Sequence, residues 1–366
     1  MNKAASDFLT AIKKYRKILI VIQGSPDPDA IASSFAIKEI LNELSIQSEI
    51  TASKKISLSQ NRAFVKQLEI PMKIVKNFQP ENFEAYIVTD FQDNNVRTLT
   101  GKIPCAAHID HHQKDRNRIK SDFTLIRTDS GSTSTLIALM IKNMEITLNP
   151  KQMKDISTAL MFGIQTDTDS YEHASDIDLE ALKFLSANAD MNIINKLNGI
   201  PISGATLNFL NRAEENSTIY KDWGFYGIDY TEVEQRDSLA ITADLILKKS
   251  GLKTIAVYSI VNDQKKHELF LDVILRTRSG TLNLNSIIKK ITPTGGGRIY
   301  KGAYQIKLDY FRNIPERDFL WKTVESSTID WLKKSRDSAY LHELSGITKN
   351  IFRKAVSFLK NEGKLP

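Results

Sequence analysis

Short apolar runs alternate with longer segments that are apolar on one side from the N-terminus to residue 190. The runs have the length of buried strands, and the longer segments repeat apolar residues at the i, i+3 and i+4 spacing of a helix. Strands that alternate with helices favour a mostly parallel sheet covered on both faces, so the predicted class of this domain is α/β. We expect strands at 18–22, 47–51, 86–89 and 106–109, and helices at 30–44, 61–68, 132–143, 151–163 and 176–189.

The pattern changes after residue 190 and divides the chain into further parts. Residues 191–218 lack strand character and contain glycine and proline, so we interpret them as a linker. A smaller α/β domain is predicted over 219–312, and a lysine-rich, mostly helical C-terminal appendage over 313–366. In the smaller domain we expect strands at 224–230, 254–261, 269–277 and 304–308, and a helix at 241–249.

Composition and charge are those of an ordinary globular chain with a basic surface. The 366 residues are 41% hydrophobic and 25% charged, and the formal net charge is +7. Excess positive charge favours polyanionic partners, although a mildly basic surface is the simpler alternative. The sequence has no run of 18 apolar residues, so no membrane span is expected, and its N-terminus has no signal-peptide core. A single cysteine, Cys105, cannot form an internal disulfide, so we expect a reducing, cytoplasmic location.

Acidic and imidazole side chains follow several of the predicted elements. The first strand ends in Gly24-Ser25-Pro26, and two carboxylates come next, just before a helix. In open α/β sheets, ligands bind at this carboxyl edge of the strands. Each such residue alone is explained by a turn or a helix cap, but their convergence on one edge favours a metal site for Mg²⁺ or Mn²⁺. The candidates are Asp27, Asp29, Asp90, Asp110, His111, His112 and Asp167.

The order of these motifs resembles that of the DHH phosphoesterase superfamily, which includes RecJ-like nucleases, nano-RNases and cyclic-dinucleotide phosphodiesterases. The motifs are Ser25-Pro-Asp-Pro-Asp-Ala-Ile-Ala-Ser33, Thr89-Asp90, Asp110-His111-His112 and Thr166-Asp167-Thr168. Two later stretches, Arg276-Thr-Arg-Ser-Gly280 and Gly295-Gly-Gly-Arg-Ile-Tyr-Lys-Gly302, resemble the substrate-binding DHHA1 domain. The resemblance implies that residues 1–190 form a DHH catalytic domain and residues 219–312 a DHHA1 domain.

The resemblance also implies a site for two metal ions, Mn²⁺ or Mg²⁺. Asp27 and Asp90 would bind the first ion. The second would be bound by Asp29, Asp90, His111 and Asp167. Asp110 would orient the ring of His111, and His112 would act on the phosphate or leaving group as a donor or general acid.

Two positions depart from the family's pattern. Gln23 stands where the family usually has a histidine ligand, and an amide oxygen binds Mn²⁺ more weakly than imidazole, so the first metal site is expected to be weakened. Arg298 stands where a histidine usually follows the glycine triplet, and its guanidinium can bind phosphate through two nitrogens. The resemblance implies a phosphate pocket made of Gly295, Gly296, Gly297, Arg298, Lys301 and Arg276, with Arg278 as a further candidate.

These features predict a metal-dependent phosphodiesterase or phosphatase that acts on short nucleotides. Nano-RNA (the substrate of an exonuclease or oligoribonuclease), linear or cyclic dinucleotides and 3′-phosphoadenosine 5′-phosphate are all open as substrates. The alternative is a catalytically impaired nucleotide-binding or regulatory protein on the same scaffold, which Gln23 motivates. A homodimer is left open. Residues 341–360 have the outline of a helix-turn-helix that could contact nucleic acid, although a packing hairpin is the simpler alternative.

Overall fold

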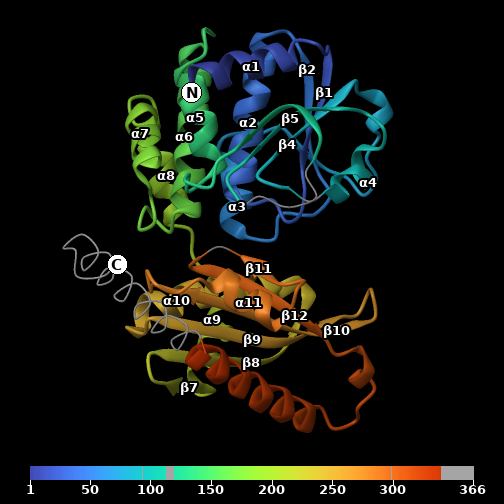
Figure 1. The fold of residues 1–366 in the computed structure, drawn as a ribbon, viewed down its shortest axis with the longest axis vertical. Coiled ribbons are helices and arrows are strands. Elements are labelled where there is room, and N and C mark those ends of the chain that lie inside the picture. Colours follow the sequence, from blue (N-terminus) through green and yellow to red (C-terminus); the bar gives the residue numbers. More distant parts are fainter. Residues whose placement is uncertain (93, 113–118, 298, 339–366) are drawn as a thin grey trace, which may run out of the picture. The chain divides into compact units, whose positions relative to one another are not determined.

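The computed structural model describes residues 1–92, 94–112, 119–297 and 299–338 (Figure 1). The chain divides into two compact units, the first spanning Met1–Pro201 and the second beginning at Ile202. Each unit combines a sheet with helices, so the predicted α/β class is confirmed. Within the described ranges, no helix has both the length and the apolar character needed to cross a membrane.

A six-stranded parallel sheet forms the centre of the first unit, in the order β3-β2-β1-β4-β5-β6. Alternate residues of the first strand enter different cores: Ile18, Ile20 and Ile22 pack on one face, and Leu19 and Val21 on the other. Because both faces are buried, this strand is apolar at every position from Ile18 to Ile22 instead of alternating. The strands are β1 (Lys17–Ile22), β2 (Gln47–Ala52), β3 (Met72–Ile74), β4 (Ala85–Thr89), β5 (Cys105–Asp110) and β6 (Ser121–Ile126).

Helices cover one face of this sheet, and shorter segments cover the other. The larger core lies between the sheet and helices α2, α5 and α6, which pack against one another. The smaller core is closed by connecting segments that carry Phe78, Phe83 and Phe91. The helices of the unit are α1 (Asn2–Ile12), α2 (Pro28–Glu43), α3 (Ser59–Gln67), α4 (Arg97–Thr100), α5 (Thr133–Lys142), α6 (Pro150–Asp167), α7 (Asp176–Leu185) and α8 (Met191–Asn198).

The second unit has a mixed six-stranded sheet in the order β11-β12-β10-β9-β8-β7, in which only the β8–β9 pair is parallel. One face packs against α9 and α10, and the other packs against α11 and a further helix at 317–338. The elements are α9 (Gly204–Glu215), β7 (Ser217–Tyr220), β8 (Trp223–Glu232), α10 (Arg236–Ser250), β9 (Thr254–Asp263), β10 (Glu268–Thr277), α11 (Leu284–Ile291), β11 (Gly296–Gly297) and β12 (Lys301–Lys307).

Two stretches have more structure than their sequence pattern indicated. Residues 191–218, interpreted as a linker, carry α8 and α9, and the division between the units falls after Pro201. In the C-terminal stretch, Leu320, Trp321 and Leu332 of the helix at 317–338 are buried in a core of the second unit. The helix-turn-helix expected at 341–360 lies outside the described residues.

Candidate metal centre

The carboxyl ends of β1, β4 and β5 bring the predicted acidic residues to one edge of the first sheet. Asp27 is the N-cap of α2, where its carboxylate accepts the backbone N–H of Ala30 at 2.9 Å. Asp29 lies in the first turn of the same helix. Asp90 directly follows β4, and Asp110 is the last residue of β5. Asp27 and Asp29 thus lie at the start of α2, and Asp90 and Asp110 lie at the ends of two neighbouring strands.

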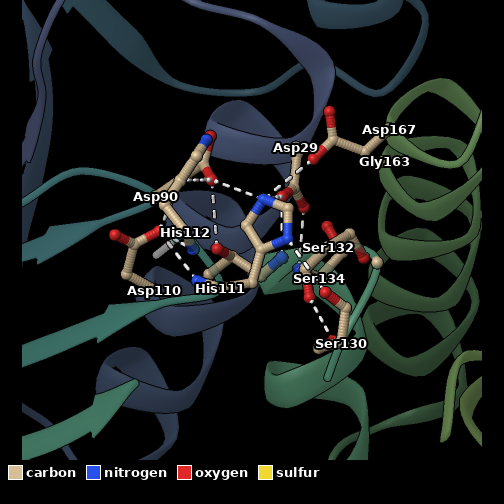
Figure 2. A network of polar contacts seen from close by, with 12 residues as sticks. Asp29, Asp90, Asp110, His111, His112, Ser130, Ser132, Ser134, Gly163 and Asp167 are labelled. Carbon is tan, nitrogen blue, oxygen red and sulfur yellow. Dashed lines mark hydrogen bonds and ion pairs between the residues drawn. The ribbon is translucent and has the colours of Figure 1, made fainter. Parts of the chain in front are cut away.

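Three of the predicted carboxylate ligands surround an imidazole nitrogen of a fourth predicted ligand, His111 (Figure 2). The Nε2 atom of His111 lies 3.1 Å from Asp167 Oδ2, 3.4 Å from Asp90 Oδ1 and 3.9 Å from Asp29 Oδ2. One ligand atom from each of these four side chains lies within 4.8 Å of the other three. Asp167 is the last residue of α6, so a helix supplies it and not an end of one of the strands. We call Asp29, Asp90, His111 and Asp167 the carboxylate–imidazole cluster; it is the set that the sequence motifs assigned to the second metal ion.

Asp29 is held in the cluster by the start of another helix. Its two carboxylate oxygens accept the backbone N–H groups of Thr133 and Ser134, each at 2.7 Å, at the N-terminus of α5. Complete burial, followed by the negative charges of Asp90 and Asp167, raises the pKa of Asp29 well above its usual range. Like charges this close repel one another, and a bound divalent cation would offset that repulsion.

The ring of His111 is oriented by a backbone carbonyl. Its Nδ1 lies 3.2 Å from the carbonyl oxygen of Ser130, so Nδ1–H donates, and in the neutral ring the lone pair is then on Nε2, which faces the carboxylates. A lone pair that faces three carboxylates is favourable when a cation lies between them. Three hard carboxylate donors and one imidazole therefore fit Mn²⁺ or Mg²⁺, and the residues present suit the ion that the motifs implied.

The expectation that Asp110 orients the ring of His111 is wrong. Oδ1 of Asp110 instead accepts the ring Nδ1–H of His112 at 2.8 Å, together with the backbone N–H groups of His111 and His112. The reason is local, because β5 ends at Asp110 and its carboxylate caps the turn formed by the next two residues. Asp110 therefore positions the next histidine of the motif.

His112 is the accessible histidine of the pair, since 39% of its side chain is exposed against 3% for His111. Burial opposes its protonated form, but the hydrogen bond to Asp110 and the charge of Asp90 more than offset this, and the pKa of His112 is raised. Burial likewise opposes ionisation of Asp110, yet the hydrogen bond from His112 lowers the pKa of that carboxyl to about 2. The pair therefore favours an imidazolium beside a carboxylate, which can donate a proton.

Asp90 adopts a backbone conformation that residues with a Cβ rarely use. Its φ is +60°, in the left-handed region, where such conformations carry a cost of about 1–3 kcal/mol and cluster at functional sites. The conformation is fixed by the bond from its backbone N–H to the carbonyl of Ile109 at 2.9 Å. The hydroxyl of Thr133 donates to its carboxylate at 3.1 Å. Asp90 is thereby turned between His111 and His112.

The residues assigned to the first metal ion are less completely assembled. In the described part of the chain, Asp27 belongs to neither group of acidic and histidine side chains that could hold an ion. The amide oxygen of Gln23, just beyond β1, is buried and accepts no hydrogen bond from the described residues. An unsatisfied buried acceptor costs about 1–3 kcal/mol, so this oxygen is a candidate partner for a bound group.

In the second unit, the glycine triplet packs tightly against its neighbours. A Cβ at Gly295 would lie 2.6 Å from side-chain atoms of Ile288 and Tyr304, and one at Gly297 would overlap the backbone of Lys301. At Gly296 the nearest atom would be 3.4 Å away. Strand packing therefore requires two of the three glycines.

Of the basic residues expected around the triplet, Arg276 is only 9% exposed, and its guanidinium binds Asp244 at 2.5 Å. An ion pair thus occupies part of this guanidinium, and a role for Arg276 in phosphate binding stays a prediction. Lys301 begins β12 and pairs across the sheet with Arg276, whereas Arg298 lies outside the described residues. Lys289, which the motifs did not indicate, has its ammonium 3.7 Å from the Cβ position of Gly296.

Comparison with known proteins agrees with this geometry. Residues 17–164 match the family model described as DHH family, N-terminal domain. Most of the first unit thus matches a DHH domain. The matched stretch includes every residue of the carboxylate–imidazole cluster except Asp167, which lies three residues beyond it. The resemblance drawn from the motifs is thus confirmed.

Related proteins match this chain over different lengths. It is 29% identical over 321 residues to uncharacterized protein MJ1633 of Methanocaldococcus jannaschii, which covers 87% of this chain and 64% of that protein. It is 28% identical over 171 residues to uncharacterized protein MG371 of Mycoplasma genitalium, covering 45% and 49% of the two chains. The chain therefore spans less than two thirds of the length of these relatives.

Among solved structures, an exopolyphosphatase-related protein from Bacteroides fragilis has a similar fold. The TM-score is 0.61 at 15% sequence identity, and the match covers 91% of this chain and 98% of that one. At this identity the likeness shows the fold alone. The matched residues of this chain extend over both units.

Proposed function

We propose that this chain is a metal-dependent phosphoesterase that hydrolyses phosphate esters of short nucleotides. The observation that carries the proposal is the carboxylate–imidazole cluster around Nε2 of His111, at the ligand-binding edge of a DHH domain. Its donor set would hold Mn²⁺ or Mg²⁺ through Asp29, Asp90, His111 and Asp167. When bound, such an ion supplies a polarised phosphoryl oxygen and a water molecule acidified for attack on phosphorus.

The protein's own groups would do the remaining work. The backbone N–H groups of Thr133 and Ser134 hold Asp29, and the carbonyl of Ser130 holds the tautomer of His111. With Nδ1–H of His112 bonded to Asp110, its Nε2–H is the proton that would pass to a phosphoryl or leaving-group oxygen. Because the neighbouring carboxylates raise the pKa of His112, it suits the role of a general acid.

The substrate class is inferred from charge and from the second unit. A net charge of +7 favours a polyanion. A phosphate of the substrate would be bound near Gly296, where the backbone is open and the ammonium of Lys289 is close, with Lys301 and Arg298 as further candidates. Nano-RNA, linear or cyclic dinucleotides and 3′-phosphoadenosine 5′-phosphate all carry such a phosphate. A cytoplasmic location, a homodimer and nucleic-acid contact by residues 341–360 stay predictions.

The test is a screen of metal ions against substrates, with products identified by mass spectrometry. We expect Mn²⁺-dependent release of mononucleotides from dinucleotides labelled at the 5′ end. The variant H112Q should lose most turnover but bind Mn²⁺ as the wild type does, because His112 acts on the substrate. D155N is a matched control, since Asp155 lies on α6 and pairs with Lys151 away from the cluster. Absence of turnover with Mn²⁺, Mg²⁺ and Co²⁺ on all of these substrates would contradict the proposal.

A further inference from the structure

Asp178 is a fully buried carboxylate that none of the sequence motifs indicated. It lies in the first turn of α7, where one oxygen, Oδ2, accepts the backbone N–H and the hydroxyl of Ser175, each at 2.7 Å. These two bonds are an ordinary helix cap. The other oxygen, Oδ1, accepts the hydroxyl of Thr135 at 2.6 Å. Both oxygens lie 3.0 Å from the backbone N–H of Gly131. The carboxylate thus joins α7 to the segment that leads into α5.

That segment, Ser130 to Thr135, carries the supports of the carboxylate–imidazole cluster. Its first carbonyl accepts Nδ1–H of His111, and the N–H groups of Thr133 and Ser134 bind Asp29. The Thr133 hydroxyl bonds to Asp90. Three of the four cluster members are therefore hydrogen-bonded to the Ser130–Thr135 segment. The carboxylate of Asp178 binds that segment in turn.

The fit between Asp178 and this segment is close. A Cβ at position 131 would lie 2.6 Å from Oδ2 of Asp178 and 2.5 Å from a methyl carbon of Thr168, so only glycine allows this approach. A helix cap needs a single acceptor oxygen, and Ser175 already occupies Oδ2. The bonds of Oδ1 to the Ser130–Thr135 segment go beyond that requirement, which separates the second role of Asp178 from capping.

We propose that Asp178 is a positioning residue of the metal centre. Its carboxylate fixes the Ser130–Thr135 segment, and through that segment it sets the places of His111, Asp29 and Asp90. This inference rests on the proposed function, since it takes the cluster to bind a divalent cation. Partners behind metal ligands typically change metal affinity by 10- to 100-fold when they are mutated. An asparagine at 178 would keep the size but turn an acceptor oxygen into a donor amide that faces other donors.

The experiment measures Mn²⁺ affinity in the full-length chain, by electron paramagnetic resonance of free Mn²⁺, and thermal unfolding after EDTA treatment. We expect D178N to raise the Kd for Mn²⁺ by about 10-fold or more. T135V removes the hydroxyl that binds Oδ1 and contacts Ser132 Oγ, and it leaves the other bonds of Asp178 in place. It should therefore raise the Kd by a smaller factor and still fold if D178N does not. D190N is the matched control, because Asp190 caps α8 through Asn192 and contacts no part of the Ser130–Thr135 segment. It should lower the melting temperature and leave the Kd within about 2-fold.

The outcomes distinguish failure of the positioning role of Asp178 from failure of the proposed metal centre. If the wild type binds Mn²⁺ but D178N and T135V bind it equally well, the positioning role is overturned and the metal centre stands. If D190N raises the Kd as much as D178N for the same loss of melting temperature, general destabilisation accounts for the effect and the role is overturned. If the wild type binds no Mn²⁺, the proposed metal centre itself fails. A raised Kd in D178N and T135V with an unchanged Kd in D190N supports the inference.

Discussion

Replacing Asp167 by asparagine probes the cluster directly, because the change keeps the side-chain size and removes one charge. The ligand atoms of Asp167 and Asp29 lie within 4.8 Å of each other. At an effective dielectric constant of about 20, two full charges at that separation repel by about 3.5 kcal/mol. Asp167 also contributes to the raised pKa of Asp29. We therefore expect metal-free D167N to be at least as stable as the wild type. Removing a carboxylate beside a histidine would ordinarily destabilise the fold, because an ion pair is lost.

Mn²⁺ should reverse this order of stability. At a Mn²⁺ concentration 100 times the Kd, binding to the native state adds about 2.7 kcal/mol. With an unfolding entropy of about 2.1 cal/mol/K per residue over Met1–Pro201, this corresponds to a rise in Tm of about 6 °C. If D167N weakens binding 100-fold, about 0.4 kcal/mol remains at the same concentration, or about 1 °C.

Differential scanning calorimetry of EDTA-treated protein, before and after addition of Mn²⁺, measures both halves of the prediction. D155N changes another carboxylate of α6 and should keep the full rise in Tm with Mn²⁺. The reasoning is refuted if D167N keeps the wild-type rise. It is also refuted if metal-free D167N loses more than about 2 kcal/mol of stability, because Asp167 would then be a structural ion-pair partner of His111.

Three further predictions concern other parts of the chain. Q23H should tighten Mn²⁺ binding several-fold in a calorimetric titration if the buried amide oxygen of Gln23 faces the centre, and an unchanged affinity would show that it does not. G297A should destabilise the second unit by about 1–3 kcal/mol in urea unfolding because its Cβ overlaps backbone, whereas G296A should stay within about 0.5 kcal/mol; equal effects would argue against the packing explanation. Hydrogen bonds from Lys221 and then from a neighbouring arginine lower the pKa of Asp337 to about 2. The contribution of Asp337 to stability is therefore present above its unfolded pKa of 3.8 and is lost as the pH falls toward 2. Melting curves of D337N, measured as a function of pH, should lack that part of the acid dependence.

The buried strands and the helices with an apolar face were predictable because burial leaves a clear pattern in the sequence. The strand expected at 18–22 is β1 (Lys17–Ile22), and the helix expected at 132–143 is α5 (Thr133–Lys142). β3 and β6 were missed, since they lie at the edges of the sheet and are partly exposed, which weakens the apolar signal. α11 was missed as well, although its apolar residues recur at the i, i+3, i+4 and i+7 spacing of a helix.

The residues that supply ligand atoms to the candidate centre were predictable from the order of the motifs. The groups that hydrogen-bond to those residues and orient them were not. Spacing placed Asp29, His111 and Asp167 at the ends of elements that meet. It could not show that Ser130 and not Asp110 orients His111, because that contact joins segments distant in sequence. The available signal was Ser132, a good N-cap preceded by glycine, which marks a helix start whose free N–H groups can bind a carboxylate.

The carboxylate of Asp29 is bound by main-chain N–H groups, and this affects which substitutions related proteins can tolerate. Every amino acid except proline supplies a backbone N–H, so the side chains at positions 133 and 134 could change without releasing the carboxylate. Comparing sequences would then give these two positions little weight, although the geometry of the centre depends on them. A related protein with proline at either position would lack one of these backbone N–H groups. It could keep the acidic motif and still fail to position the carboxylate of Asp29.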